Sequence, residues 1–188
     1  MLDIGNPFNK EEILEAFDLV HNTLTTFFSD LSVKNFFSHP PDVWSAADNL
    51  DHLNRSVYPL RRAMQLPLEA LEKRFGLAQR PSSPYADVAA RYKAELAKGL
   101  QAGGNFLPAE ELSGDANQAA QTALVDTWKV NCRGLVDVIQ MWQETDLDKY
   151  IIPHPAMSDM TTREMLFFTL YHDQHHLKDV KIMLGILE

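Results

Sequence analysis

The sequence is poor in cysteine and in basic residues. Its 188 residues include one cysteine, Cys132, which excludes an intrachain disulfide framework and any zinc or iron–sulfur site built from several thiolates. Lysine and arginine number 17 against 26 aspartates and glutamates, which gives a formal net charge of −9. Because phosphate binding requires a basic surface, this balance predicts that the protein has no nucleic-acid partner.

Long apolar runs are also absent. No segment approaches the ~18 consecutive apolar residues of a membrane-spanning helix, and the longest apolar stretches, such as Met165–Leu170, belong to amphipathic segments. The N-terminal residues MLDIGNP lack the basic and apolar regions of a secretory signal. We therefore expect a cytoplasmic protein that has no membrane partner.

What the sequence does contain is an ordinary globular composition with helical periodicity. Hydrophobic residues make up 45% of the chain and charged residues 23%, and a chain of this length typically forms one domain, here expected over residues 1–188. Strand signals are scarce, because no Asn-Gly or Asp-Gly pair separates alternating apolar runs. We predict an all-α fold, a four-helix bundle with one or more short extra helices.

Capping signatures, apolar spacing and helix breakers predict the boundaries of these helices. Asn9 with Glu12, and Thr161 with Glu164, have the spacing of capping boxes. Pro59 lies inside the second segment and should kink or divide it. The expected helical segments are Lys10–Leu31, Ser45–Leu66, Leu68–Phe75, Tyr85–Gln101, Asn117–Gln143 and Thr162–Leu187. The expected connections include Ser32–Val43, Asn105–Gly114 and Glu144–Met160.

The chain is rich in histidine, with seven copies. His172 and His176 are four residues apart in the last segment, so their rings lie on one face of a helix. At about 100° per residue, both fall close to the line that joins Met165 to Met183, whereas His175 falls toward the edge of that face. The pair is suited to bind one metal ion, although buried histidines are also commonly held by hydrogen bonds alone.

A third ligand has to come from elsewhere, because a catalytic zinc usually takes three protein ligands plus water. The candidates are His21, His39, His52, His154 and the carboxylates. Periodicity places His52 about 120° from the apolar stripe of its segment, which by itself predicts an exposed polar residue. A second inward face of that helix could instead line a cleft, where Asp48, one turn earlier, would hydrogen-bond the His52 ring.

Two stretches resemble the signatures of the DinB-like superfamily. The segment WSAADNLDHL, residues 44–53, resembles the first signature, and LYHDQHHL, residues 170–177, resembles the second. Between them, PHP at residues 153–155 followed by TREMLFF at residues 162–168 resembles a lead-in found in one branch. The two signatures stand in the expected order within a helical chain of suitable length.

This resemblance implies a bundle of up-up-down-down connectivity and a metal site formed by His52, His172 and His176. It also implies zinc or nickel as the metal, and a homodimer. Relatives include metal-dependent thiol S-transferases, isomerases that use low-molecular-weight thiols, and hydrolases, so the expected substrate is a small molecule or a low-molecular-weight thiol. The alternatives are a non-enzymatic, stress-linked metal-binding protein and a structural dimer module.

A site of this kind would also need acid or base groups. Three neutral imidazoles leave a divalent ion its full charge and an open position, at which a water or a thiol becomes a usable nucleophile. Asp48, His154 and His175 are the candidate catalytic residues for moving a proton there. Cys132 is not expected to take part, because a lone cysteine within a helix usually behaves as a small buried hydrophobe.

Overall fold

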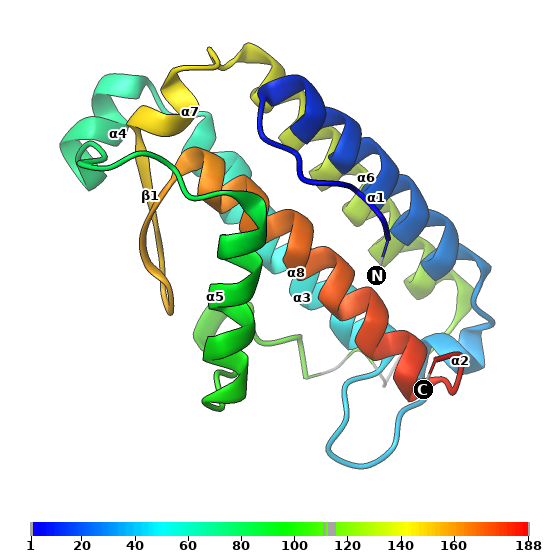
Figure 1. The fold of residues 1–188 in the computed structure, drawn as a ribbon. Coiled ribbons are helices and arrows are strands. Elements are labelled where there is room, and N and C mark those ends of the chain that lie inside the picture. The colour runs from blue at the N-terminus through cyan, green and yellow to red at the C-terminus, as the bar shows by residue number, and fades with distance from the viewer. Residues whose placement is uncertain (1, 111, 113–115, 188) are drawn as a thin grey trace.

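The computed structural model describes residues 2–110, 112 and 116–187, and within them the protein is mostly helical (Figure 1). The helices are α1 Lys10–Asp30, α2 Val33–Phe37, α3 Ala46–Met64, α4 Leu68–Phe75, α5 Tyr85–Ala97, α6 Gln118–Met141, α7 Asp146–Lys149 and α8 Thr162–Met183. The other described elements are a 3-10 turn, η1 Gly104–Phe106, and the antiparallel strands β1 Ile151–His154 and β2 Ser158–Thr161.

Each of the six predicted helices is present, and each ends within four residues of its expected boundary. Pro59 lies inside α3 without dividing it. The short helices α2 and α7 form in segments that were expected to be connections. Residues 111, 113 and 114 of the expected loop Asn105–Gly114 lie outside the described residues, and the start of that loop forms part of η1.

The four long helices α1, α3, α6 and α8 run side by side, and α1 and α3 each pack against both α6 and α8 (Figure 1). Two contacts along their length show that α1 and α8 are parallel. His21 lies against Asp173, with 3.5 Å between Nε2 and Oδ2, and farther along both helices the ammonium group of Lys181 lies over the ring of Phe27.

Helices α3 and α6 are parallel as well. The side chains of Asn54 and Asn131 share a hydrogen bond of 2.9 Å, and toward the C-terminal ends the indole N–H of Trp142 donates to the carbonyl of Met64. Helices α3 and α8 are antiparallel, because Asn49 contacts His176 while His52, farther along α3, contacts the earlier His172. The N-terminal half of α3 therefore lies beside the C-terminal half of α8. This pairing brings the two sequence signatures together.

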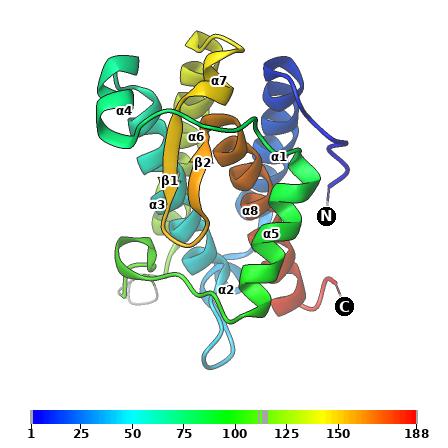
Figure 2. The ribbon, with the colours of Figure 1, turned by 60° about the vertical axis from the view of Figure 1, so that its left-hand side comes forward.

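The helix directions are therefore up, down, down, up in chain order, so the predicted up-up-down-down order is wrong. The short connection between α1 and α3 reverses the chain once. The connection between α3 and α6 is long enough to return the chain to the end of the bundle at which α3 begins, so that α6 can run parallel to α3. Helices α4 and α5 and the turn η1 lie within this connection. Of these, α5 packs on α8 as an additional long element (Figure 2).

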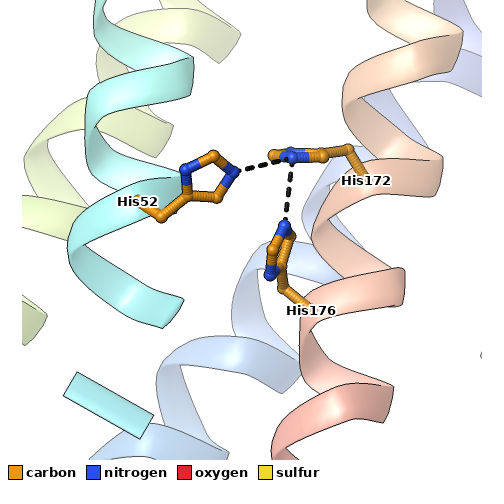
Figure 3. A group of neighbouring side chains, drawn as sticks. All are labelled: His52, His172 and His176. Carbon is orange, nitrogen blue, oxygen red and sulfur yellow. Dashed lines mark hydrogen bonds between the residues drawn. The ribbon is translucent and has the colours of Figure 1, made fainter. Parts of the chain in front are cut away.

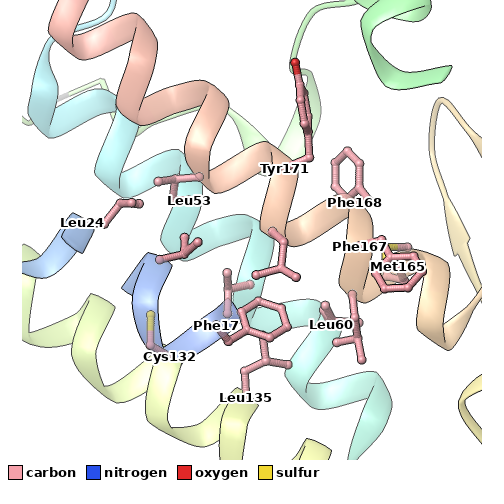
Figure 4. Close-up of a cluster of buried hydrophobic side chains, with 14 of the residues drawn as sticks. Phe17, Leu24, Leu53, Leu60, Cys132, Leu135, Met165, Phe167, Phe168 and Tyr171 are labelled. Carbon is pink, nitrogen blue, oxygen red and sulfur yellow. The ribbon is translucent and has the colours of Figure 1, made fainter. Parts of the chain in front are cut away.

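Helix α8 is the centre of the core. Every residue from Thr162 to Gln174 is buried, which is typical of a helix covered on all sides. Apolar side chains of α8, including Phe167, join Phe17 of α1, Leu60 of α3 and Leu135 of α6 in one cluster (Figure 4). Such a core fixes the rotation of α8 about its axis, and with it the direction of the α8 histidines.

The strands β1 and β2 are a feature that the sequence patterns missed, so the all-α prediction is incomplete. They pair from Ile151 with Thr161 to His154 with Ser158 (Figure 2). Residues 155–157 form the turn between them, and Ser158, which begins β2, has a φ of 62°. Nδ1 of His154 accepts the backbone N–H groups two and three residues later. A histidine side chain therefore stabilises this turn, which contains neither an Asn-Gly nor an Asp-Gly pair.

The part of the chain that the structure describes holds no helix with the length and hydropathy of a bilayer-spanning segment.

The start of α8 is attached to the connection before α5. Thr161 and Glu164 form the predicted capping box, and the carboxylate of Glu164 also accepts hydrogen bonds from the Arg80 guanidinium and the Ser83 backbone N–H. Burial alone would raise the pKa of Glu164, but these hydrogen bonds and that of the Thr161 amide lower it to about 2. The ionised carboxylate is thus stabilised by folding.

We expect Glu164→Gln to lower the free energy of unfolding near neutral pH, with a loss that shrinks in acid. Because the pKa of Glu164 is about 2 in the folded protein, below the ordinary value of 4.5, its contribution is present above pH 4.5 and disappears as the pH falls toward 2. Urea unfolding at several pH values measures this difference. Asp126→Asn, which removes an exposed ion pair with Lys129, is the control. A loss that does not depend on pH would contradict the assignment.

Candidate metal centre

Three histidines from two helices converge inside the protein (Figure 3). Nε2 of His172 lies 3.0 Å from Nε2 of His52 and 3.1 Å from Nε2 of His176. All three side chains are buried, with at most 7% of their surface exposed. The structure therefore brings together the three residues that the resemblance implied as metal ligands, and their ring nitrogens lie within 4.8 Å of one another.

Hydrogen bonds on the outer side of the rings fix two of the tautomers. Nδ1 of His52 lies 2.6 Å from the carbonyl oxygen of Phe106, and Nδ1 of His176 lies 2.7 Å from Oδ1 of Asn49. Both partners accept, because the Phe106 carbonyl has no proton to donate and the Asn49 NH₂ group donates to the Ser45 carbonyl, which leaves Oδ1 facing the ring. Each Nδ1 therefore carries the proton. Nε2 of His52 and of His176 are then lone-pair donors that face the third ring.

This arrangement fits a cation better than it fits the three side chains alone. Two Nε2 lone pairs face one Nε2 atom, that of His172, which can supply a single N–H. In neutral rings, one of the two lone pairs is therefore left without a donor in a buried position. A divalent cation accepts lone pairs from all three nitrogens at once, and three imidazoles with an open fourth position are a known zinc ligand set.

The surroundings keep the rings neutral. Burial lowers the pKa of His172 and His176 well below the ordinary value, and each is lowered further by the neighbouring imidazoles. Burial also lowers the pKa of His52, which the bond to the Phe106 carbonyl offsets in part. The indole of Trp44 stacks on His176 at 18° between the ring planes, with centroids 6.1 Å apart. Neutral imidazoles are the form that ligates metals.

His52 is buried, although helical periodicity predicted that it would be exposed. Its own helix buries one stripe in the core, but the opposite face of α3 lines a cavity instead of facing solvent. The prediction that Asp48 would hydrogen-bond the His52 ring is also wrong. The Asp48 carboxylate caps α3 by accepting from the amide and hydroxyl of Ser45, so Asp48 is not positioned for proton transfer at the histidines.

The two remaining candidate catalytic residues line the same cavity. His175 lies on α8 with Nε2 3.4 Å from Oδ2 of Asp179. His154 lies on β1 against the ring of Phe168, with centroids 4.3 Å apart. Since Nδ1 of His154 accepts two backbone N–H groups, its neutral ring carries the proton on Nε2, which is left to contact a ligand.

The other candidates lie away from the three histidines. His39 is exposed in the loop after α2, and its Nδ1 contacts the Pro40 carbonyl. His21 is buried on α1 beside Asp173, on the side of α8 that faces the core. Cys132 is buried in the core, where desolvation raises the pKa of its thiol, so it stays protonated and unreactive.

The residues that hydrogen-bond the outer nitrogens of the rings, Asn49 and Phe106, were not predicted from the sequence. Asn49 stands inside the first signature, one turn before His52, but nothing in its spacing distinguishes it from a surface asparagine. Phe106 contributes only a backbone carbonyl from η1, and any residue could supply it. Such partners orient metal-ligating histidines and set their tautomers.

The three histidines lie on the wall of a cavity of about 1650 Å³. The facing sides of α3 and α8 form its floor, while residues of α5, η1 and β1 contribute to its other walls. Its lining is mostly apolar and includes Leu60, Leu96, Phe106 and Ile152. A concave, mostly apolar space with a few convergent polar groups is typical of a ligand-binding site.

Comparisons with known proteins identify the family of the chain and a solved structure of similar fold. The sequence matches the DinB superfamily over residues 16–180. The fold is similar to that of a crystal structure described as the colibactin self-resistance protein ClbS in complex with a dsDNA, with a TM-score of 0.51. The sequence identity is 16%, and the alignment covers 97% of this chain and 99% of that chain. No curated protein matches the chain.

The ClbS structure contradicts the prediction that a nucleic-acid partner is excluded. That protein has a similar fold over almost its whole length and is described in complex with a dsDNA. The prediction relied on the net charge of −9, which is a sum over the whole chain. A summed charge does not describe the local potential of any one face. The homodimer and the cytoplasmic location stay predictions.

We expect Asn49→Ala to weaken the binding of added Zn²⁺ about 10–100-fold, because the His176 ring loses the acceptor that orients it. Asn49→Asp keeps an acceptor oxygen and should retain most of the affinity. Competition with a chromophoric chelator measures the dissociation constants. Asn22→Ala, on the exposed face of α1, is the matched control. Equal affinities in Asn49→Ala and the wild type would contradict this role.

We expect His154 to stay neutral down to about pH 4. Burial, together with the nearby positive charge of Arg91, lowers the pKa of His154 to about 4. Because the ordinary pKa is 6.5, the unfolded chain gains a proton first, so this residue costs stability as the pH falls from 6.5 to 4. NMR titration of the imidazole C–H resonances measures the pKa. A midpoint near 6.5 would place the ring in water and contradict the structure.

Proposed function

The chain belongs to the DinB superfamily, and from this premise we propose that it is a divalent-metal-dependent enzyme acting on a small molecule. His52, His172 and His176 would hold the ion, with zinc or nickel as the metal. The reaction class is transfer of a thiol sulfur or hydrolysis. We also propose that residues 1–188 form one domain and that the four long helices form a four-helix bundle.

One observation carries this proposal. Three buried Nε2 atoms converge, and the single N–H among them cannot hydrogen-bond both of the remaining lone pairs. Two rings donate outward, to the Phe106 carbonyl and the Asn49 amide oxygen. Histidines that were merely structural would pair donors with acceptors, as buried polar groups generally do. The position of the cluster on a cavity wall supports an enzyme over a closed structural site, because a catalytic ion needs an open position.

A bound divalent cation would supply Lewis-acid chemistry, which lowers the pKa of a water or a thiol and makes it nucleophilic near neutral pH. The residues of the chain have separate tasks. Asn49 and the Phe106 carbonyl hold two of the rings, and Trp44 covers them. The apolar walls reduce the access of water, so that electrostatic interactions inside are stronger than in solution.

His154 is suited to hydrogen-bond a substrate. Its fixed tautomer leaves an Nε2–H donor on a residue that lines the cavity. A neutral donor can stabilise negative charge that develops on an oxygen of the substrate, as oxyanion-hole groups do. His175, which is paired with Asp179, is the candidate for accepting a proton.

A metal-content measurement tests the ligand set. We expect the purified chain, without an affinity tag and after Zn²⁺ supplementation and dialysis, to retain about one zinc ion per chain. The variants His172→Ala and His176→Ala should lose it, because two imidazoles bind Zn²⁺ far more weakly than three. His39→Ala is the matched control, since His39 is exposed in a loop. Retention of zinc by the double variant His172→Ala/His176→Ala would contradict the proposal.

A thiol titration separates the enzyme from the non-enzymatic alternatives. With Co²⁺ in place of zinc, an open coordination position should bind 2-mercaptoethanol and give a thiolate-to-cobalt charge-transfer band. Cys132 cannot produce this band itself, because it is buried and its thiol pKa is raised. Bound cobalt with no band at saturating thiol would favour a structural or vestigial metal site and contradict thiol transfer.

A further inference from the structure

The cavity extends far beyond the three histidines, along one face of α3. The residues of α3 that line it recur at helical spacing from Asn49 to Ala63, and those of α8 recur from Met165 to Met183. At about 1.5 Å per residue, these faces are about 21 Å and 27 Å long. The histidines lie near the middle of the α8 face and one turn from the Asn49 end of the α3 face, so a small thiol alone would occupy little of the groove.

One half of the groove, which we call the long arm, leads from His52 toward α4. Its walls are apolar and come from α3, α4, β1 and α8, through Pro59, Ala63, Phe75, Ile152 and Met165. Two of the α3 residues that line this arm, Ser56 and Ala63, carry small side chains, whereas their neighbours Val57 and Met64 are buried in the core. The small side chains at these two positions leave room in the groove beside Leu60, which also lines it.

The charges along the groove are divided by sign. Arg62 and Arg74 line the end of the long arm, and both are exposed at its mouth. The guanidinium of Arg74 lies over the ring of Phe75, at 5.1 Å from its centroid. The acidic lining residues, Asp42 and Asp179, lie in the opposite half, beyond the histidines. An anionic group would thus be attracted to the α4 end and repelled from the other.

We propose that the long arm binds an elongated ligand with an apolar body and a terminal anionic group of the carboxylate class. The anion pairs with Arg62 and Arg74, the body lies along Pro59 and Ala63, and the far end reaches the three histidines. This assignment rests on the proposed function, in that it names the substrate class of the same site. It predicts selectivity for chain length and for charge, which a small thiol would not show.

Displacement of a dansyl-labelled undecanoic acid from the zinc-loaded full chain tests this. Dodecanoate should displace the probe at lower concentration than 1-dodecanol, and dodecyltrimethylammonium should be the weakest of the three. In Arg62→Gln/Arg74→Gln, the dodecanoate affinity should fall about tenfold or more, as expected for the loss of charge-assisted contacts, while the affinity for 1-dodecanol stays unchanged. Lys129→Gln/Arg133→Gln, which removes two charges from α6, is the matched control.

A second variant tests the apolar body. Ala63→Phe, at a half-buried helical position, should fill the long arm and weaken both dodecanoate and 1-dodecanol, while circular dichroism and zinc content stay as in the wild type. Equal binding of the three ligands, or dodecanoate affinity unaffected by the arginine or Ala63 variants, would overturn the proposal.

Zinc content separates the two claims. If dodecanoate binds with the expected arginine dependence to protein that holds no zinc even after supplementation, the metal function fails and the ligand class stands. If the protein binds zinc through the three histidines but shows none of this selectivity, the ligand class fails and the metal function stands.

Discussion

The central constraint on this structure is the meeting of three buried imidazole nitrogens that cannot all be satisfied by one another. Two outward hydrogen bonds, to Asn49 and to the backbone of Phe106, determine which nitrogen of each ring points inward. The buried location of α8 and the antiparallel pairing of α3 with α8 then set the distances. Each of these features restricts the rings further, so few arrangements compete with the one in which the three nitrogens converge. Preorganisation of this kind lowers the cost of ordering the ligands upon binding.

The two helices that carry the histidines have two inward faces each. One face of α3 packs in the core with Leu50, Leu53 and Val57, while the other forms the floor of the cavity. The same division holds for α8, where Asp173 faces α1 and His172 faces the cavity. The additional elements α5, η1 and the β1–β2 hairpin make this possible, because they cover a second side of the helices that would otherwise face solvent.

The sequence allowed most of the helices to be predicted, because their signals are local. Capping boxes at Asn9 and Thr161, and apolar residues three and four apart, depend on neighbours in the chain. The helix directions and the hairpin depend on longer-range relations. No periodic pattern in the sequence shows that the connection between α3 and α6 lets these two helices run in the same direction. The hairpin turn is stabilised by His154, and histidine is not a typical turn residue.

The same distinction applies to the candidate site. His172 and His176 were recognisable from their spacing, since both lie on one helix. His52 required the family resemblance, because its burial comes from elements remote in sequence. Asp48 was assigned to the wrong partner, since its capping role competes with a contact to the ring. The whole-chain charge misled the prediction about nucleic acid, because it carries no information about where charges lie.

X-ray absorption spectroscopy at the zinc edge of the loaded protein tests the central claim most directly. We predict three nitrogen ligands at about 2.0–2.1 Å with the multiple-scattering pattern of imidazole, together with one light oxygen or nitrogen ligand in the fourth position. A sulfur ligand at about 2.3 Å, or a shell of six oxygen atoms without imidazole scattering, would show that the three histidines do not hold the ion.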